Sequence, residues 1–172
     1  MASTIFFPMK ATPHEVMERL ARRYPAMDLS ATETLAALLR VAALILNATD
    51  EQLARKKTSR GKLSILFFLN RDPDAPATPS DLAESIGVTR ATITGLLDGL
   101  ERDGMVRRED GDDGRSIKAR LTAKGRRFLD ALLPDRYKRA RALMKGLPEK
   151  DRRALQRLLQ KVEQGLPSYG KR

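Results

Sequence analysis

The segment from residue 78 to residue 125 constrains the fold of this chain more than any other, because helix starts and stops follow one another closely there. Thr78 is suited to cap the start of one short helix, and Gly87 is suited to a left-handed stop at its end. After a tight turn, Thr89 is suited to cap a second helix, which Gly104 ends. Two short helices joined by a tight Gly-containing turn predict a helix-turn-helix.

The second of these helices has one apolar face and one polar face. Apolar residues recur there at the i, i+3, i+4, i+7 spacing of a buried stripe, at Ile93, Leu96, Leu97 and Leu100. Hydroxyl groups and one guanidinium fill the polar face of its first turns, at Thr89, Arg90, Thr92 and Thr94. Such groups suit phosphate oxygens and base edges, and the second helix of a helix-turn-helix usually enters the major groove. The alternative is a solvated face whose threonines act as caps, although threonine is not a favoured filler of exposed helix positions.

A β-hairpin is expected next, with strands at residues 105–108 and 116–121 and a turn-forming connection at 109–114. In the second strand Ile117 and the alternate residues after it are apolar, while the residues between them are basic or polar, so one face is apolar and the other basic. A basic hairpin beside a recognition helix is a wing. The alternative is an ordinary solvated hairpin loop.

The chain resembles the MarR (multiple antibiotic resistance regulator) family of winged helix-turn-helix transcription factors over SDLAESIGVTRATITGLLDGLERDGMVRRE and DGRSIKARLTAKG. The second stretch follows the family's wing pattern at Asp113, Arg115, Ser116, Leu121, Thr122 and Gly125. The resemblance implies a mainly α fold with a small β-hairpin wing, flanked by N- and C-terminal dimerisation helices. It implies a regulator of transcription, and most simply a repressor.

The resemblance also implies how the chain would hold double-stranded DNA. The wing arginine, Arg115, would enter the minor groove while the recognition helix reads the major groove. The residues that we expect at the DNA are Ser80, Thr89, Arg90, Thr92, Thr94, Arg107, Arg108, Asp113, Arg115, Ser116 and Lys118. Gly95 and Gly99 depart from the family, whose members often carry basic or larger polar residues there, so base reading moves towards the first turns of the helix.

The N-terminal flank predicts a helical region over residues 1–60. Capping-box patterns at residues 12–15 and 30–33 predict a short helix to about Tyr24 and a long helix to about Lys57. The long helix is apolar on nearly every side between residues 35 and 48, a run too short and interrupted for a membrane span. A helix of this kind must be buried, and a partner subunit would supply the surface.

The C-terminal flank, residues 122–172, predicts two further helices around the winged lobe at 61–121. Thr122 would open one helix, which Pro134 would kink or break, and Pro148 would begin the last. Leucines and a valine recur at helical spacing in that last helix, at Leu155, Leu158, Leu159 and Val162. The resemblance implies a homodimer interleaved through both flanks, which would bind a pseudo-palindromic operator; the alternative is a monomer with these helices packed on the winged core.

Composition supports a polyanionic partner and excludes several kinds of site. The net charge of the 172-residue chain is +11, but residues 90–130 carry only +2 of it and residues 135–172 carry +8. The chain has no cysteine and a single histidine, His14, so neither a thiol switch nor a clustered metal site is expected. We find no nucleophile–base pair and no phosphate-binding glycine loop, so we expect neither an enzyme nor a cofactor.

Three further expectations concern location, other functions and ligand. The apolar run near the N-terminus is too short for a secretory signal, which favours the cytoplasm. An architectural DNA-binding protein of low sequence specificity, or a peripheral membrane protein held by its basic last helix, would also account for the diffuse charge. The family often has a pocket for small aromatic or phenolic anions, and four residues lie on helices that could line one: Arg40, Asn47, Phe67 and Phe68. Both phenylalanines sit in an apolar run that is more typical of a core.

Overall fold

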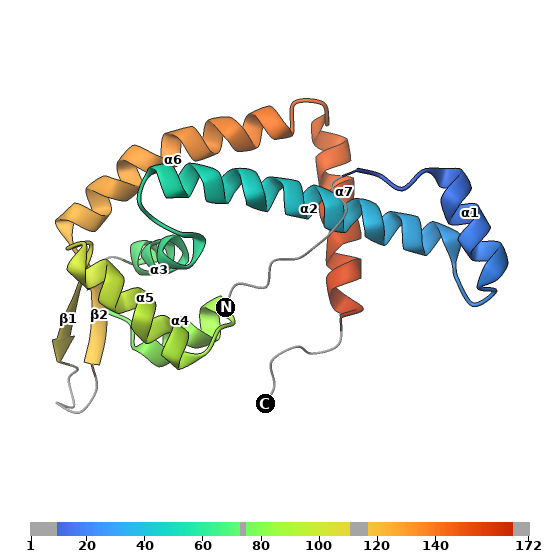
Figure 1. Cartoon of the computed structure of the whole chain (residues 1–172). Coiled ribbons are helices and arrows are strands. Elements are labelled where there is room, and N and C mark those ends of the chain that lie inside the picture. The colour runs from blue at the N-terminus through green and yellow to red at the C-terminus, as the bar shows by residue number, and fades with distance from the viewer. Residues whose placement is uncertain (1–9, 73–74, 111–116, 167–172) are drawn as a thin grey trace. The chain divides into compact units, whose positions relative to one another are not determined.

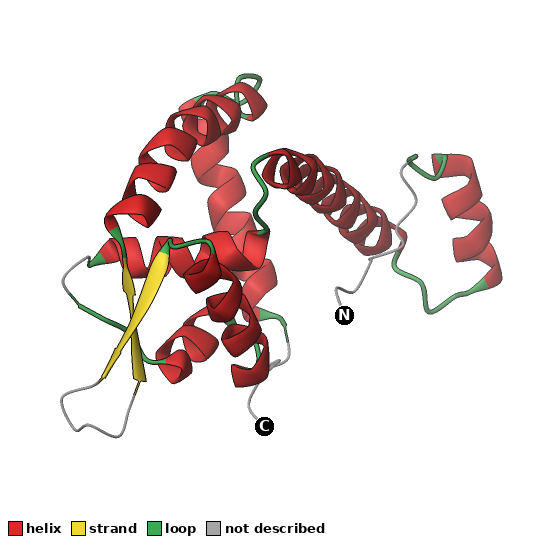
Figure 2. Cartoon of the chain, turned by 60° about the vertical axis from the view of Figure 1, so that its left-hand side comes forward, coloured by secondary structure: helices red, strands yellow, loops and turns green. Residues whose placement is uncertain are grey.

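The computed structural model describes residues 10–72, 75–110 and 117–166, which form helices and a two-stranded antiparallel sheet (Figure 1, Figure 2). The chain divides into two compact units, one reaching to Arg60 and the other starting at Gly61. In chain order the elements are α1 (His14–Arg23), α2 (Leu29–Arg55), α3 (Arg60–Arg71), α4 (Pro79–Ile86), α5 (Arg90–Arg102), β1 (Val106–Asp110), β2 (Ile117–Leu121), α6 (Ala123–Leu143) and α7 (Glu149–Gln164). The expected mainly α fold with a small hairpin is confirmed.

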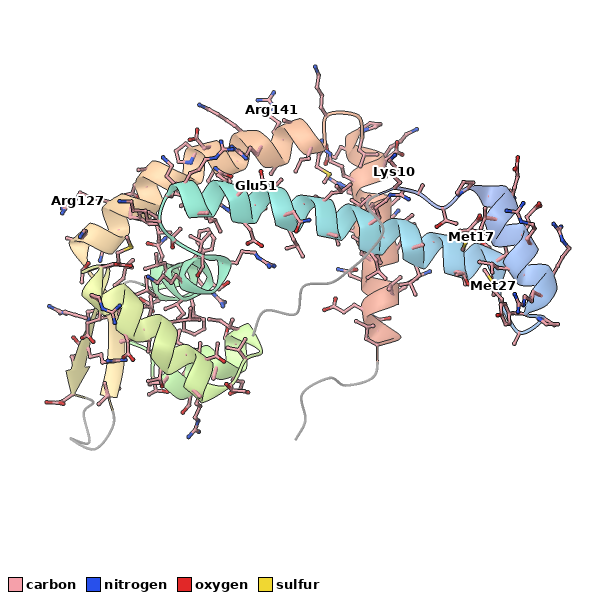
Figure 3. All side chains as sticks on the ribbon, viewed as in Figure 1. Lys10, Met17, Met27, Glu51, Arg127 and Arg141 are labelled. Atoms are coloured by element: carbon pink, nitrogen blue, oxygen red, sulfur yellow. The ribbon has the colours of Figure 1, made fainter. Side chains whose placement is uncertain are left out.

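In the first unit, α1 packs on α2 through Met17, which is buried and lies between the two helices in Figure 3. The caps differ from the predicted ones. Asp28 caps α2, because its Oδ1 accepts from the N–H of Ala31 at 2.9 Å, whereas we expected the cap at Ser30. Glu33 is therefore not part of a capping box, and its Oε1 lies 2.6 Å from Nδ1 of His14 on α1. The predicted box at residues 12–15 is also wrong, since the N-cap of α1 is Pro13, without a side-chain cap.

The C-terminal end of α2 is a Schellman motif built without glycine. The N–H of Lys57 donates to the carbonyl of Ala54 at 2.9 Å, and that of Thr58 donates to the carbonyl of Leu53 at 3.0 Å. Lys57 has a φ of 54°, the left-handed conformation that glycine usually supplies at this position. The backbone of Lys57 therefore adopts a conformation that is costly for a residue with a Cβ.

Most of α2 is exposed or half-buried within the chain itself. Apolar side chains lie at its surface, with Leu35 53% and Val41 49% exposed. The helix has 27 residues and an apolar window that would suffice, by length and composition alone, to cross a membrane. The run at residues 35–48, which we predicted to be too short and interrupted for a span, is only part of this helix, and the core helix of a soluble protein passes the same test of length and composition.

The second unit begins with α3, whose buried residues are Leu63, Ile65, Leu66 and Leu69. The helix-turn-helix α4–α5 follows with the predicted caps. Thr78 and Asp81 form a capping box: the N–H of Thr78 donates to Oδ2 of Asp81 at 2.9 Å, and Oγ1 of Thr78 accepts from the N–H of Asp81 at 3.2 Å. The backbone N–H and the hydroxyl of Thr78, both donating to the carboxylate, lower the pKa of Asp81 below its usual value. Gly87 (φ 74°) and Gly104 (φ 70°) end the two helices in the left-handed conformation.

The hairpin pairs β1 with β2 in a register that places Val106 opposite Leu121 and Arg108 opposite Ala119. Strand β1 extends to Asp110, two residues further than expected, so the strands continue past the helices in Figure 2. Ala119 and Leu121 are buried as predicted. Ile117 is 53% exposed, because the hairpin has left the helical core at that point.

The hairpin is joined to α6 by a close approach at Gly125. Thr122 caps α6 by accepting from the N–H of Gly125 at 3.0 Å, and its hydroxyl is within hydrogen-bond distance of the carbonyls of Gly104 and Met105. A Cβ on Gly125 would lie 2.2 Å from the carbonyl oxygen of Met105. Only glycine therefore fits at this position.

Helix α6 runs as one ribbon through Pro134, so the proline does not break it (Figure 1). Its outer face is basic: Arg127 and Arg141 project away from the helix into solvent (Figure 3). In α7, which the structure describes in full, no residue is buried, and Leu158 is 58% and Val162 47% exposed. The terminal helices thus present apolar residues that the chain by itself leaves uncovered.

Candidate nucleic-acid interface

The first turns of α5 hold the predicted polar cluster at the surface. Oγ1 of Thr89 accepts from the N–H of Thr92 at 3.2 Å and lies 2.9 Å from the hydroxyl oxygen of Thr92. The hydroxyl of Thr94 donates to the carbonyl of Arg90 at 3.0 Å. All four residues are exposed. The hydroxyls are thus held in place by bonds within α5, while their remaining lone pairs and the guanidinium of Arg90 lie on the solvent side.

The two glycines of α5 have different surroundings. A Cβ on Gly95 would meet nothing within 4 Å, so the helix backbone is open to a close neighbour there. A Cβ on Gly99 would lie 2.8 Å from Cε of Lys62, whose ammonium binds Oδ2 of Asp103 at 2.6 Å. The absence of a Cβ at Gly99 therefore leaves room for the Lys62 side chain to pass over α5 and reach Asp103. Of the two glycines, Gly95 is the one whose surface is open to a ligand.

The basic residues of the hairpin stem divide between its two faces. Side chains alternate along a strand, so Arg107 lies on the face opposite to that of Val106, and 64% of its side chain is exposed. Lys118 lies opposite Glu109 on the same outer face and is half-buried. Arg108 shares the inner face with Val106 and forms ion pairs with two carboxylates of α5, Asp98 and Glu101.

The remaining predicted contacts are placed only in part. Ser80 is half-buried in the first turn of α4. Asp113, Arg115 and Ser116 lie outside the described residues, so the wing tip stays a prediction. The sequence analysis assigned no role to Asp98 and Glu101. Their spacing of three residues on the recognition helix, together with an inward-facing arginine on the strand that follows, is the pattern that could have predicted their ion pairs with Arg108.

A hollow of about 580 Å³ opens in the second unit between α3, α4 and α6. Phe67, Phe68 and Tyr137 contribute aromatic rings to its lining, and Arg71 contributes a cation. The guanidinium of Arg136 lies 5.4 Å from the centroid of Phe67, within the range of a cation–π contact. The further lining residues are Ser64, Asn70, Ser85, Ile86 and Leu133.

The two predicted aromatic pocket residues therefore line a real hollow, and both are half-buried instead of filling the core. Arg40 and Asn47 belong to α2 in the first unit, where Arg40 is half-buried and Asn47 is exposed. Their assignment to a ligand pocket stays a prediction.

A helix-turn-helix with a β-hairpin after its second helix and a polar, exposed N-terminal half on that helix defines the class of winged-helix proteins. A sequence model of the MarR family matches residues 58–116, which contain α4, α5 and β1. The chain is 34% identical to the HTH-type transcriptional repressor YetL of Bacillus subtilis (strain 168) over 133 residues, 77% of this chain and 80% of that protein. The HTH-type transcriptional regulator PecS of Dickeya dadantii (strain 3937) is 27% identical over 154 residues, 88% of this chain and 93% of PecS.

The chain belongs to the MarR family of transcriptional regulators. Solved structures agree on the fold. The S. aureus MepR–DNA complex aligns with a TM-score of 0.68 at 19% identity, over 77% of this chain and 95% of MepR. The MarR family transcription regulator SP03579 aligns with a TM-score of 0.68 at 20% identity, over 87% of this chain and 93% of its own.

Proposed function

We propose that this protein is a homodimeric, sequence-specific DNA-binding repressor of the bacterial cytoplasm. The observation that carries the proposal is α5: its first turns present Arg90, Thr92 and Thr94 to solvent on the second helix of a helix-turn-helix. The hairpin that follows α5 carries the exposed Arg107 on its outer face. These are the group types that bind phosphates and base edges. YetL is described as a repressor and MepR has been solved with DNA, which supports the same role here.

A second copy of the chain is the partner that we propose for the terminal helices. Leu35 and Val41 on α2 and Leu158 and Val162 on α7 are exposed in the single chain. Exposed apolar helices of this length need cover from protein or from lipid. A DNA-binding role favours protein, because two recognition helices related by a two-fold axis would match a pseudo-palindromic operator.

We further propose that the hollow beside Phe67 and Phe68 binds a small aromatic or phenolic anion that releases the protein from DNA. Its volume lies in the range of small-molecule sites. The rings of Phe67, Phe68 and Tyr137 would stack on an aromatic ligand, and Arg71 would bind its anionic group. A ligand that prefers the DNA-free arrangement of the dimer would shift the population towards it.

The direct test is an electrophoretic shift with duplex DNA flanking the protein's own gene. We expect salt-sensitive binding to the cognate duplex that exceeds binding to a random duplex of equal length. Arg115→Ala should weaken binding strongly, and Thr92→Ala should change the preference among sites more than the overall affinity. Equal affinity for both duplexes, with a steep salt dependence, would instead establish the architectural alternative that the diffuse C-terminal charge suggests.

The ligand proposal has its own test. Hydroxybenzoate isomers should displace the protein from DNA and raise its thermal stability, and Arg71→Gln should abolish the advantage of these anions over neutral phenols. Arg127→Gln, on the outer face of α6, is the matched control. If neither ligand class affects stability or DNA binding, the hollow is not an effector site.

A further inference from the structure

The stem of the hairpin carries two adjacent arginines that point in opposite directions. Arg108 lies opposite buried Ala119 in the register and on the same face as Val106, which is 2% exposed. Arg107 lies opposite Arg120 on the other face. Because side chains of neighbouring strand residues alternate between faces, one arginine turns towards the helices and the other turns away.

Arg108 is bound to the recognition helix at three points. Its Nη1 donates to Oε2 of Glu101 at 3.0 Å, and its Nη2 donates to Oδ1 of Asp98 at 2.6 Å. Its backbone N–H donates to Oε1 of Glu101 at 3.3 Å. The two carboxylates lie one turn apart on α5, so the planar fork of the guanidinium spans both. Only 29% of the Arg108 side chain is exposed.

Arg107 has much looser surroundings. Its Nη2 lies 3.4 Å from Oε2 of Glu109, and 64% of its side chain is exposed. Glu109 also binds Nε of Arg120 at 2.9 Å, so the outer face of the stem holds two arginines around one carboxylate. The outer face therefore carries an excess of positive charge. The positive charge of Arg108, in contrast, is paired with the carboxylates of Asp98 and Glu101.

We propose that Arg108 is a positioning residue that clamps the wing to the recognition helix through Asp98 and Glu101, and that it does not bind DNA phosphate itself. A two-stranded hairpin is marginally stable alone and needs attachment to hold one orientation. A clamp of this kind would hold the wing and α5 in one fixed relative orientation before DNA binds. The conformational entropy lost on DNA binding would then be smaller. Its single positive charge also offsets one of the two carboxylate charges that would otherwise repel the phosphates. The inference rests on the proposed DNA binding.

The first experiment compares Arg108→Gln with Arg107→Gln, a matched pair of neighbours with the same chemical change. Two quantities are measured: the Kd for the cognate duplex over a range of salt concentrations, and amide hydrogen exchange of β1 and β2 in the DNA-free protein. We expect Arg108→Gln to raise Kd by about tenfold without changing the salt slope, and to speed exchange in the hairpin. Arg107→Gln should lower the salt slope by about one and leave exchange unchanged.

Asp98→Asn gives a second test, in which the sign of the effect decides. Removing a negative charge from the recognition helix would tighten DNA binding if Asp98 had no structural role. Loss of the clamp would weaken it instead and speed hairpin exchange, as in Arg108→Gln. Arg108→Lys should restore part of the affinity, because a lysine reaches one carboxylate but cannot span two.

Failure of the inference can be told apart from failure of the proposed function. If the unaltered protein binds no DNA, the proposed function fails, while hydrogen exchange in the free chain still tests the clamp. If the protein binds DNA but Arg108→Gln lowers the salt slope by about one and leaves hairpin exchange unchanged, Arg108 is a phosphate contact and the clamp is wrong. Tighter binding by Asp98→Asn would overturn it as well.

Discussion

Gly125 and Thr122 show at the level of single residues why the wing and the helix after it share one short motif. The hydroxyl of Thr122 caps α6 and also lies within hydrogen-bond distance of the carbonyls of Gly104 and Met105, which follow α5. Gly125 lets α6 approach the carbonyl of Met105 closely. Their spacing of three residues is dictated by the cap geometry, in which the N-cap side chain binds the third helical residue.

We expect Gly125→Ala to destabilise the protein by about 2–4 kcal/mol, because the added Cβ would lie 2.2 Å from a backbone oxygen and 2.7 Å from Cδ1 of Leu121. Gly95→Ala is the control: its Cβ meets nothing within 4 Å, so the higher helix propensity of alanine should stabilise by about 1 kcal/mol. Urea denaturation measures both. Equal effects of the two substitutions would mean that α6 does not approach Met105 closely.

At Lys57 we expect the opposite of Gly125→Ala: removing the side chain should increase the stability of the protein. With a φ of 54° in a Schellman motif, Lys57→Gly should stabilise the protein by up to about 1 kcal/mol, since glycine adopts this conformation without a Cβ clash. Lys57→Ala keeps the Cβ and should bring no such gain. Thermal unfolding of the three proteins in parallel checks the prediction, and an equal gain from alanine would contradict it.

At the level of elements, α1 is attached to α2 by Met17 and by the contact of His14 with Glu33 at 2.6 Å. The hydrogen bond to Glu33, together with its negative charge, raises the pKa of His14 above its usual value. A histidine with a raised folded-state pKa contributes stability that is fully present below its unfolded pKa and is lost as the pH rises through the folded one. The attachment of α1 should therefore weaken from mildly acidic to alkaline pH.

This pH dependence can be read from hydrogen exchange of the α1 amides, corrected for the intrinsic effect of pH. Protection of α1 should be greater on the acidic side of neutrality than on the alkaline side, and His14→Gln should remove the difference. The α5 amides, remote in sequence and without a histidine, serve as the internal reference. Protection that is independent of pH in the unaltered protein would show that the His14–Glu33 contact contributes nothing measurable.

For the whole molecule, the uncovered apolar residues of α2 and α7 are the surface that we propose for the homodimer. Leu158 is 58% exposed on α7, and we expect Leu158→Glu to convert the dimer into a monomer, because a buried carboxylate without a partner is costly at an interface. DNA affinity should fall with it, since one recognition helix reads only one half-site. Arg157→Glu is the control and should leave the dimer intact. Sedimentation velocity distinguishes the two outcomes, and a dimeric Leu158→Glu protein would place the interface elsewhere.

The sequence by itself determined the local structure wherever a residue type has a narrow physical role. Threonine caps, glycines in the left-handed conformation and the apolar spacing of α5 predicted the helix-turn-helix at the correct boundaries, because these signals act within a few residues. Where two caps competed the pattern failed, as at Ser30, because Asp28 lies earlier in the chain and accepts the same kind of bond. Pro134 did not break α6, which continues through it from Ala123 to Leu143, although local propensity predicts a kink or a break there.

Only the tertiary structure decided what each charged or small residue does. Arg107 and Arg108 are identical in sequence terms, yet one lies exposed and the other is bound to Asp98 and Glu101, because strand alternation and the packing of β1 on α5 assign them to different faces. Gly95 and Gly99 likewise differ only through Lys62, a residue on α3. Such roles depend on contacts between segments distant in sequence, and local propensity carries no information about these contacts.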